Sequence, residues 1–134
     1  MQLTPYLMFN GNCEEALNFY AQTIGGEIKN LSRDEGSPAE SISEDKQKVM
    51  HANFEGNGIA FMASDGSGKP VSNVGNIHLC IDFKDLNAMD NVFNALCEGG
   101  EITMPLQDTF WGARFGMLTD KFGINWMFNS DTTK

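Results

Sequence analysis

The sequence has few cysteines, few positive charges and no apolar run at its start. Its three cysteines, Cys13, Cys80 and Cys97, show no C-x-x-C spacing, and an odd number cannot all pair within one chain. We therefore expect three reduced thiols in a cytoplasmic protein. The opening residues, MQLTPYLMFN, have neither the charged start of a signal peptide nor the length of a membrane span.

The low content of basic residues excludes a further class of partner. Nine Lys and Arg stand against eighteen Asp and Glu, which gives a formal net charge of −9. A chain without a basic stripe cannot neutralise phosphates, so we expect no nucleic-acid or membrane partner. The segment GSGK at 66–69 lacks the rest of a P-loop and is typical of a linker. With 134 residues, 41% of them hydrophobic, the chain has the size and composition of one globular domain.

The sequence contains an internal repeat. The tetrapeptide GGEI occurs at 25–28 and at 99–102, which is an offset of 74 residues. The same offset relates three further pairs, namely Phe9 and Phe83, Phe19 and Phe93, and Ala21 and Ala95. GIAFM at 58–62 matches GINWM at 123–127 at the shorter offset of 65, because the polar stretch 34–47 has no long counterpart. These collinear matches indicate a duplicated module.

Each copy of the module has the pattern strand, helix and three strands. In the first copy we expect a strand at 3–9, a helix that begins with Asn12 as N-cap and Glu15 in a capping box, and a hairpin around Asn57-Gly58. In the second copy we expect a strand at 76–83, a helix at 85–98 and three further strands. The predicted fold class is α+β, a single domain over 1–134 of two tandem βαβββ modules. Module 1 spans about 1–65, a linker spans 65–75, and module 2 spans about 76–130. Each module forms a curved mixed sheet with a helix on its convex face.

Strand alternation predicts which side chains face away from each helix. In the first module these are His51, Asn53 and Met62, because Ile59, Phe61 and Ala63 form the helix-packing set. In the second module Ile77, Leu79, Ile81 and Phe83 form the helix-packing set of the first strand, which leaves His78 on the other face. Asn125 and Met127 face the same way by the same argument.

The position of Arg114 depends on the length of the turn DKFG. A four-residue loop puts Arg114, Gly116 and Leu118 on the open face, whereas a loop of three or five residues reverses them. A guanidinium on an apolar wall needs a partner, which is either an anionic ligand or a carboxylate such as Asp82 or Asp108. Trp111 is a candidate either for the core or for a site.

The stretches PYLMFNGNCEEALNFY, VMHANF and FWGARFGMLTDKFGINWMFN resemble the PhnB-like branch of the vicinal oxygen chelate superfamily, which includes glyoxalase I, bleomycin-resistance proteins and extradiol dioxygenases. Enzymes of the superfamily hold a divalent metal with one residue from each of four strands. The resemblance implies that these positions fall at Thr4 or Pro5, Met62, His78 and Met127. Thioether sulfur is a soft, neutral ligand that does not suit such an oxygen and nitrogen site, so we expect no tightly bound transition metal and no cofactor.

The resemblance and the lost ligands together predict a metal-free small-molecule-binding protein whose ligand is unknown. The alternative is an enzyme that uses His78 or His51 as general acid or base on a small anionic substrate. A domain that binds a protein partner is a third possibility, and a structural role for each lone histidine is the plainer interpretation. The candidate ligand-binding residues are His78, Arg114, His51, Met62, Met127, Trp111, Asn53 and Asn125.

The resemblance also predicts a homodimer, because modules of this superfamily often assemble across a two-fold axis. Apolar residues at strand edges, including Met8 and Phe110, are the candidate contacts. We expect light scattering at micromolar concentration to give a mass near twice the 14.8 kDa of one chain. A mass of one chain under these conditions would contradict the prediction.

Overall fold

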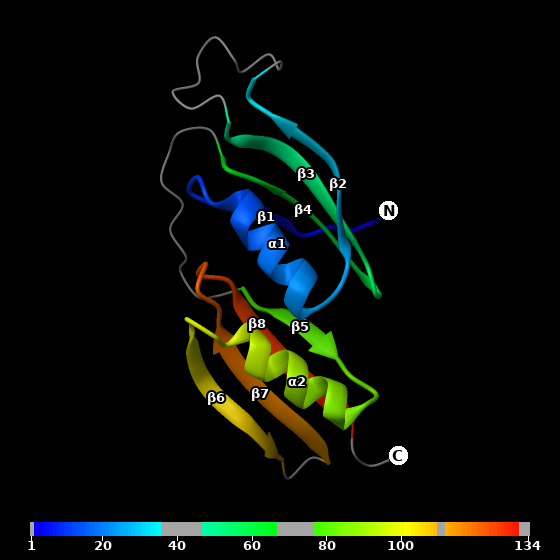
Figure 1. Cartoon of the computed structure of the whole chain (residues 1–134). Coiled ribbons are helices and arrows are strands. Elements are labelled where there is room, and N and C mark those ends of the chain that lie inside the picture. Colours follow the sequence, from blue (N-terminus) through cyan, green and yellow to red (C-terminus); the bar gives the residue numbers. More distant parts are fainter. Residues whose placement is uncertain (1, 36–46, 67–76, 110–111, 132–134) are drawn as a thin grey trace. The chain divides into compact units, whose positions relative to one another are not determined.

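The computed structural model describes residues 2–35, 47–66, 77–109 and 112–131. The chain divides into two compact units, Met1–Ser72 and Asn73–Lys134, each with one helix and one four-stranded sheet (Figure 1). Within the described ranges, neither helix combines the length and the apolar character needed to cross a membrane.

The first unit contains β1 (Tyr6–Met8), α1 (Cys13–Thr23), β2 (Glu27–Arg33), β3 (Val49–Gly56) and β4 (Ile59–Ser64). Its sheet has the order β1-β4-β3-β2, in which β1 is parallel to β4 and the other neighbours are antiparallel. Pro5 directly precedes β1, which is an edge strand, so its missing N–H removes no bond from the middle of the sheet.

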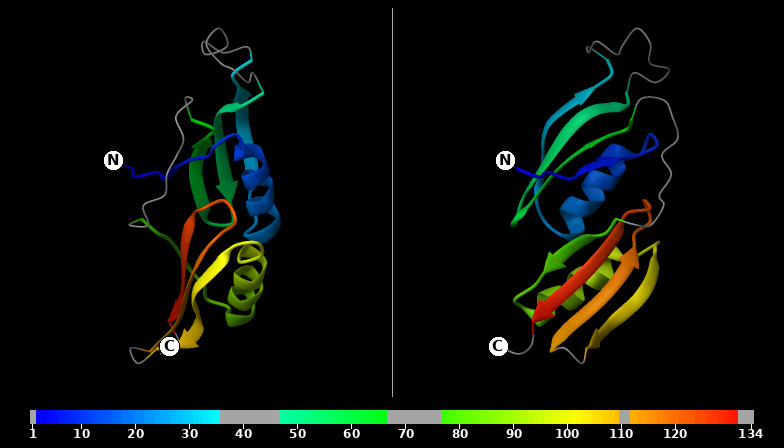
Figure 2. Two further views of the ribbon diagram at one scale, coloured as in Figure 1. Left: turned by 90° about the vertical axis from the view of Figure 1, so that its left-hand side faces the viewer. Right: turned by 180° about the vertical axis from the view of Figure 1, so that it is seen from behind.

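The second unit repeats this architecture with β5 (Leu79–Asp82), α2 (Leu86–Leu96), β6 (Glu101–Asp108), β7 (Ala113–Thr119) and β8 (Asn125–Asp131). Its order is β5-β8-β7-β6, and β5 is again parallel to its neighbour. In each unit the helix forms one layer and the sheet a second layer (Figure 2). The predicted fold class, α+β with two tandem βαβββ modules in mixed sheets, is confirmed.

The strand register is the same in both units. Tyr6 lies opposite Met62 in the first parallel pair, and Cys80 lies opposite Met127 in the second. These two pairs are related by the offsets of 74 and 65 residues that the sequence repeat gives. Gly25 and Gly99, the first glycines of the two GGEI segments, have φ values of 79° and 77°, a conformation that side chains with a Cβ rarely adopt. The repeat therefore marks the same helix exit twice.

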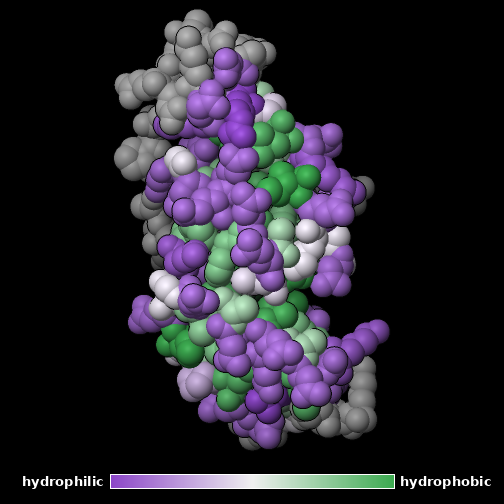
Figure 3. Space-filling view, viewed as in Figure 1, coloured by the Kyte–Doolittle hydropathy of each residue, from purple (hydrophilic) through white to green (hydrophobic). Residues whose placement is uncertain are grey.

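Aromatic side chains join each helix to its sheet. In the first unit, Phe54 and Phe61 stack with centroids 4.8 Å apart, and Tyr20 of α1 meets Phe61 edge-on. In the second unit, Phe128 stacks on Phe83 and meets Phe93 of α2 edge-on. These contacts identify the helix face of each sheet. The side of the units shown in Figure 3 is largely hydrophilic, with smaller apolar areas between the polar side chains.

The turn between β7 and β8 has five residues, so the second alternative for Arg114 is the correct one, and Arg114 lies on the helix face instead of the open face. Residues 120–124 separate the last cross-strand pair, and Arg114 lies opposite Ser130 on the same side as the pair of Leu118 and Trp126. The carboxylate of buried Asp120 determines this turn. It accepts hydrogen bonds from the backbone N–H groups of residues 122 and 124 and from the indole of Trp126, at 2.8, 3.1 and 2.8 Å.

Arg114 is paired within the second unit. Its guanidinium donates to Asp90 of α2 at 3.0 Å, a carboxylate that the sequence analysis did not consider. Ile77 also differs from its expected position: it precedes β5 and is 73% exposed rather than packed under the helix. Leu79 and Ile81 lie opposite Trp126 and Phe128, so the alternation predicted for the strand itself is correct.

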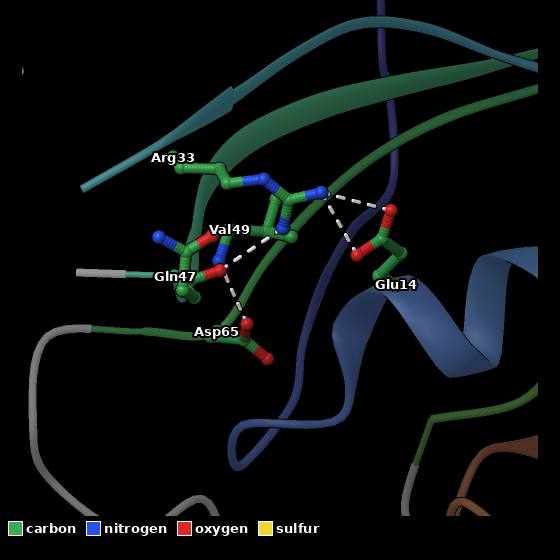
Figure 4. Close-up of polar contacts among 5 residues, drawn as sticks. All are labelled: Glu14, Arg33, Gln47, Val49 and Asp65. Carbon is green, nitrogen blue, oxygen red and sulfur yellow. Dashed lines mark hydrogen bonds and ion pairs between the residues drawn. The ribbon is translucent and has the colours of Figure 1, made fainter. Parts of the chain in front are cut away.

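The N-terminus of α1 is capped from a distant part of the chain. Asn12 is the N-cap residue, but its side chain makes no capping bond, so the predicted capping box is not formed. Instead, Oδ1 of buried Asp65 accepts from the N–H groups of Gly11 and Cys13 at 3.0 and 2.8 Å. Oδ2 of Asp65 accepts from the N–H of Val49 at 2.8 Å (Figure 4). One carboxylate thus joins the end of β4 to the starts of α1 and β3.

Asp65→Asn is predicted to lower the free energy of unfolding by about 2–4 kcal/mol. An amide has one accepting oxygen, so at least one buried N–H loses its partner and the remaining bonds lose the assistance of the charge. The matched control is Asp85→Asn at the N-cap of α2, where the exposed side chain accepts one bond, from Asn87. Asn and Asp cap helices equally well, so the control should change stability by less than about 0.5 kcal/mol. Equal losses in urea denaturation of the two variants would contradict the role of Asp65.

Burial of Cys13 is predicted to make stability fall in alkaline solution. Burial, with Asp65 and Glu14 nearby, raises the pKa of the Cys13 thiol from 9.0 to about 12. The raised pKa belongs to the folded state. The protonated thiol therefore contributes its full share to the free energy of unfolding below pH 9, and this share is lost as the pH rises toward 12. The free energy of unfolding should therefore fall with a slope of up to about 1.4 kcal/mol per pH unit from this group. Urea unfolding between pH 8 and 10.5 measures this slope. Cys13→Ala should remove the part of the slope that Cys13 causes. An unchanged slope in the variant would show that other groups cause it.

Candidate functional site

The open face of the first sheet, opposite α1, brings together three of the predicted site residues. Met62 lies at the centre of one row, with Tyr6 on one side and Asn53 on the other. His51 lies two residues before Asn53 on β3, and the intervening Ala52 is fully buried on the helix face. The predicted orientation of His51, Asn53 and Met62 away from the helix therefore agrees with the register.

Tyr6 and His51 form a contact across the strand that separates them. The Tyr6 hydroxyl lies 3.4 Å from Nδ1 of His51, and the two ring centroids are 5.9 Å apart at an interplanar angle of 49°. When the phenol donates to Nδ1, the imidazole carries its proton on Nε2 and can donate that proton to another molecule. The pair thus combines two aromatic surfaces with one available donor.

The remaining strand, β2, adds polar groups to this face. Ser32 lies opposite His51, and its hydroxyl donates to the His51 carbonyl at 3.5 Å. Lys29 lies opposite Asn53 and forms an ion pair of 3.5 Å with Glu55. Both partners of this ion pair are about half exposed, so the pair is weak and leaves the ammonium within reach of an anion.

The open face of the second sheet has a different chemistry. Met127 lies between Cys80 and Met117, and Met117 in turn lies opposite Met104. Cys80 is exposed at the surface of the sheet, but partial desolvation of its thiol, with the charge of Asp82, raises the pKa of that thiol. This face is therefore lined by sulfur where the first is lined by aromatic and polar groups.

The other predicted residues of the second unit lie in different places. His78 is exposed and directly precedes β5. Asn125 is on the open face but is engaged, because it accepts from the Thr119 hydroxyl at 2.8 Å and donates to the Ile77 carbonyl at 3.3 Å. Arg114 is on the helix face with Asp90, and Trp111 lies outside the described residues.

Sequence reasoning missed Tyr6 and Ser32. Tyr6 carried a usable signal in the sequence. It matches Cys80 at the repeat offset of 74 residues, so the face predicted for Cys80 also predicts the face of Tyr6. Ser32 carried no such signal, since register shifts interrupt the pairing of β2 with β3 on both sides of it. A bulge changes the face of a side chain without leaving a trace in the sequence pattern.

The residues at the expected metal positions do not fit a divalent ion. Met62 and Met127 supply only thioethers, and Pro5 offers its carbonyl to the Met62 N–H at 2.9 Å. Within the described ranges, no three His, Cys, Asp or Glu side chains come together. Catalytic sites for such ions use at least three oxygen, nitrogen or thiolate ligands. The donor set at these positions therefore does not suit a divalent metal.

Comparisons with known proteins agree with this architecture. The family described as 3-demethylubiquinone-9 3-methyltransferase matches residues 1–128. The solved structure of protein PA1353 from Pseudomonas aeruginosa has a TM-score of 0.87 and 39% identity, with 98% of each chain covered. The putative 3-demethylubiquinone-9 3-methyltransferase, PhnB protein, from Bacillus cereus has a TM-score of 0.82 and 33% identity, over 97% of this chain and 99% of that one.

A more distant structure shares the fold alone. The glyoxalase/bleomycin resistance protein/dioxygenase family enzyme from Burkholderia phytofirmans has a TM-score of 0.64 at 14% identity, over 94% of this chain and 96% of that one. The duplicated βαβββ unit, the register of its parallel strands and the match over nearly the whole length lead to one assignment. The chain belongs to the PhnB-like family described as 3-demethylubiquinone-9 3-methyltransferase, and it shares its fold with the glyoxalase/bleomycin resistance protein/dioxygenase structure.

Proposed function

We propose that this protein binds a small organic molecule on the open face of its first sheet, without a divalent metal. The observation that carries the proposal is the contact between Tyr6 and His51 beside Met62 and Asn53. A few polar groups that converge on a largely apolar surface are typical of small-molecule sites. The misfit of thioethers at the expected metal positions supports binding without such an ion.

The side chains favour a planar molecule that carries hydrogen-bond acceptors. The Tyr6 and His51 rings and the Met62 thioether offer apolar and polarisable surface, on which flat rings pack well. His51 Nε2, the Asn53 amide and the Lys29 ammonium are donors, so an oxygen-bearing or anionic ligand would find partners at the edge of that surface.

An enzyme is the second candidate, and the same contact favours it. A phenol next to an imidazole can pass a proton to His51 while the imidazole gives another to a substrate, as a general acid does. This alternative assigns His51 rather than His78, since His78 has no such neighbour among the contacts of the described residues. Homodimer formation and a cytoplasmic location remain part of the proposal, on the resemblance and on the cysteine content respectively.

The test is a screen of small planar carboxylic acids and their neutral amides by NMR. We expect hits to shift the signals of Tyr6, His51, Asn53 and Met62, and acids to bind more tightly than the matched amides because of Lys29. The double substitution Tyr6→Leu with His51→Gln should weaken hits at least about tenfold, which corresponds to about 1.4 kcal/mol.

The matched control is Arg114→Met, which removes a cation from the helix face of the second unit and should leave every hit unchanged. Its cost in stability should not exceed about 1 kcal/mol, because the ion pair with Asp90 is partly exposed. Hits that survive the double substitution, or that are lost in Arg114→Met, would overturn the proposed site.

A further inference from the structure

Four sulfur-bearing side chains form one continuous row across the second sheet. Cys80 on β5 lies opposite Met127 on β8, Met127 lies opposite Met117 on β7, and Met117 lies opposite Met104 on β6. The chain has eight methionines and three cysteines among its 134 residues. A row that holds one of them on every strand of a sheet therefore calls for a physical explanation.

Cys80, Met127 and Met117 lie on the open face. Trp126 and Phe128, the neighbours of Met127 in sequence, are buried on the helix side, where Phe128 contacts Phe93 of α2. Residues directly opposite each other in a regular ladder share a face, so Cys80 and Met117 follow Met127. Met104 lies opposite Met117 between two register shifts, so the rule does not extend to it. Cys80 is exposed and the three methionines are partly exposed, so the row is accessible from outside the unit.

The spacing of the row allows several sulfur atoms to reach one ion. Met117 and Met127 are opposed on antiparallel strands, where Cβ atoms are about 4.5–5.5 Å apart. Cys80 lies on β5, the parallel neighbour of β8, and neighbouring strands are about 4.8 Å apart. Methionine has three rotatable bonds and an unbranched chain, so the thioethers of Met117 and Met127 can turn toward the Cys80 sulfur from their two strands. Met104, at the far end, is the fourth and most distant sulfur.

Ordered polar groups flank the row on both sides. Asn129 donates to Asp82 at 3.0 Å on one side, and the Thr119 hydroxyl donates to Asn125 at 2.8 Å on the other. Each of these pairs is engaged internally, and the side chains of the row between them carry sulfur.

We propose that the sulfur row binds one copper(I) ion through the Cys80 thiolate and the thioethers of Met127 and Met117. Soft sulfur ligands select copper(I) over the hard or borderline divalent ions, which prefer oxygen and nitrogen. The thiol gives its proton to solvent when the ion binds, and no electron is transferred. The Met127 thioether thus disfavours hard divalent ions and favours copper(I). The site lies in the second unit and does not depend on the proposed function of the first.

The contrast with the first unit provides a natural control. The equivalent row there consists of Tyr6, Met62, Asn53 and Lys29, so Met62 is the counterpart of Met127 with no sulfur neighbour in its row. The thiol control is Cys97, which lies after α2 and donates to the Asn94 carbonyl at 3.2 Å.

The test uses the full-length, untagged and reduced protein. Copper(I) is titrated in competition with a chromophoric chelator under nitrogen, and silver(I) serves as a redox-inert probe for NMR. We expect one equivalent to bind and to shift the ε-methyl signals of Met117 and Met127, with a smaller shift at Met104 and none at Met62.

The variants separate the row from a lone thiol. Cys80→Ser should weaken copper(I) binding about 100-fold, and Met117→Leu with Met127→Leu about tenfold or more, whereas Cys97→Ser and Met62→Leu should change it less than about twofold. Leucine has nearly the volume of methionine, and circular dichroism checks that each variant is folded. Three outcomes would overturn the proposal. Copper(I) binding could survive the double methionine substitution, it could be lost in Cys97→Ser, or the unsubstituted protein could bind copper(I) no more tightly than Cys80→Ser does.

Discussion

The Asp65 carboxylate is the interaction on which the first unit depends. It binds three backbone N–H groups that come from the loop before α1, from the first residue of α1 and from the first residue of β3. The donors of Cys13 and Val49 would otherwise be buried without a partner, at a cost of about 1–3 kcal/mol each. Arg33 reinforces the same end of the unit, because its guanidinium donates to both oxygens of Glu14 on α1 and to the Gln47 carbonyl, each at 3.0 Å (Figure 4). With α1 held on one face in this way, the opposite face of the sheet, where Tyr6 and His51 meet, stays open.

The sequence was sufficient for what depends on local pattern. The order of the elements, the Asn57-Gly58 hairpin and the faces of Phe61, Met62 and Asn53 all follow from periodicity of two and from turn chemistry. The sequence was insufficient where a distant side chain decides. The cap of α1 is supplied by Asp65, which follows Cys13 by 52 residues of chain. No local rule relates such partners, so the capping box was mispredicted. The contact between Tyr6 and His51 is of the same kind, since it spans 45 residues of sequence. The face of Arg114 depended on the length of the turn before β8, which the sequence pattern left undecided between two alternatives.

The two units keep one backbone and carry different side chains on it. The positions of Tyr6, Asn53 and Lys29 in the row across the first sheet are those of Cys80, Met117 and Met104 in the second, while methionine occupies the central position in both. Hydrogen-bond donors in one unit are thus replaced by soft sulfur in the other, although the helix faces remain aromatic in both. Such divergence is expected when packing constrains only the buried face of a sheet, because exposed positions tolerate substitution at small cost in stability.

The different caps of the two helices have a consequence for the order in which the units fold. The second unit has Ser130 at the position that corresponds to Asp65. Its helix α2 is capped instead by Asp85, which directly precedes the first residue of the helix. The α2 turn can therefore close its cap as soon as those few residues are ordered. The bond from Cys13 to Asp65 that caps α1 can form only after about 50 residues of chain have been brought together. Closing this loop costs conformational entropy before the bond is gained. Two copies of one module would then differ in folding rate, with the second ordering its helix early and the first only when its last strand is in place.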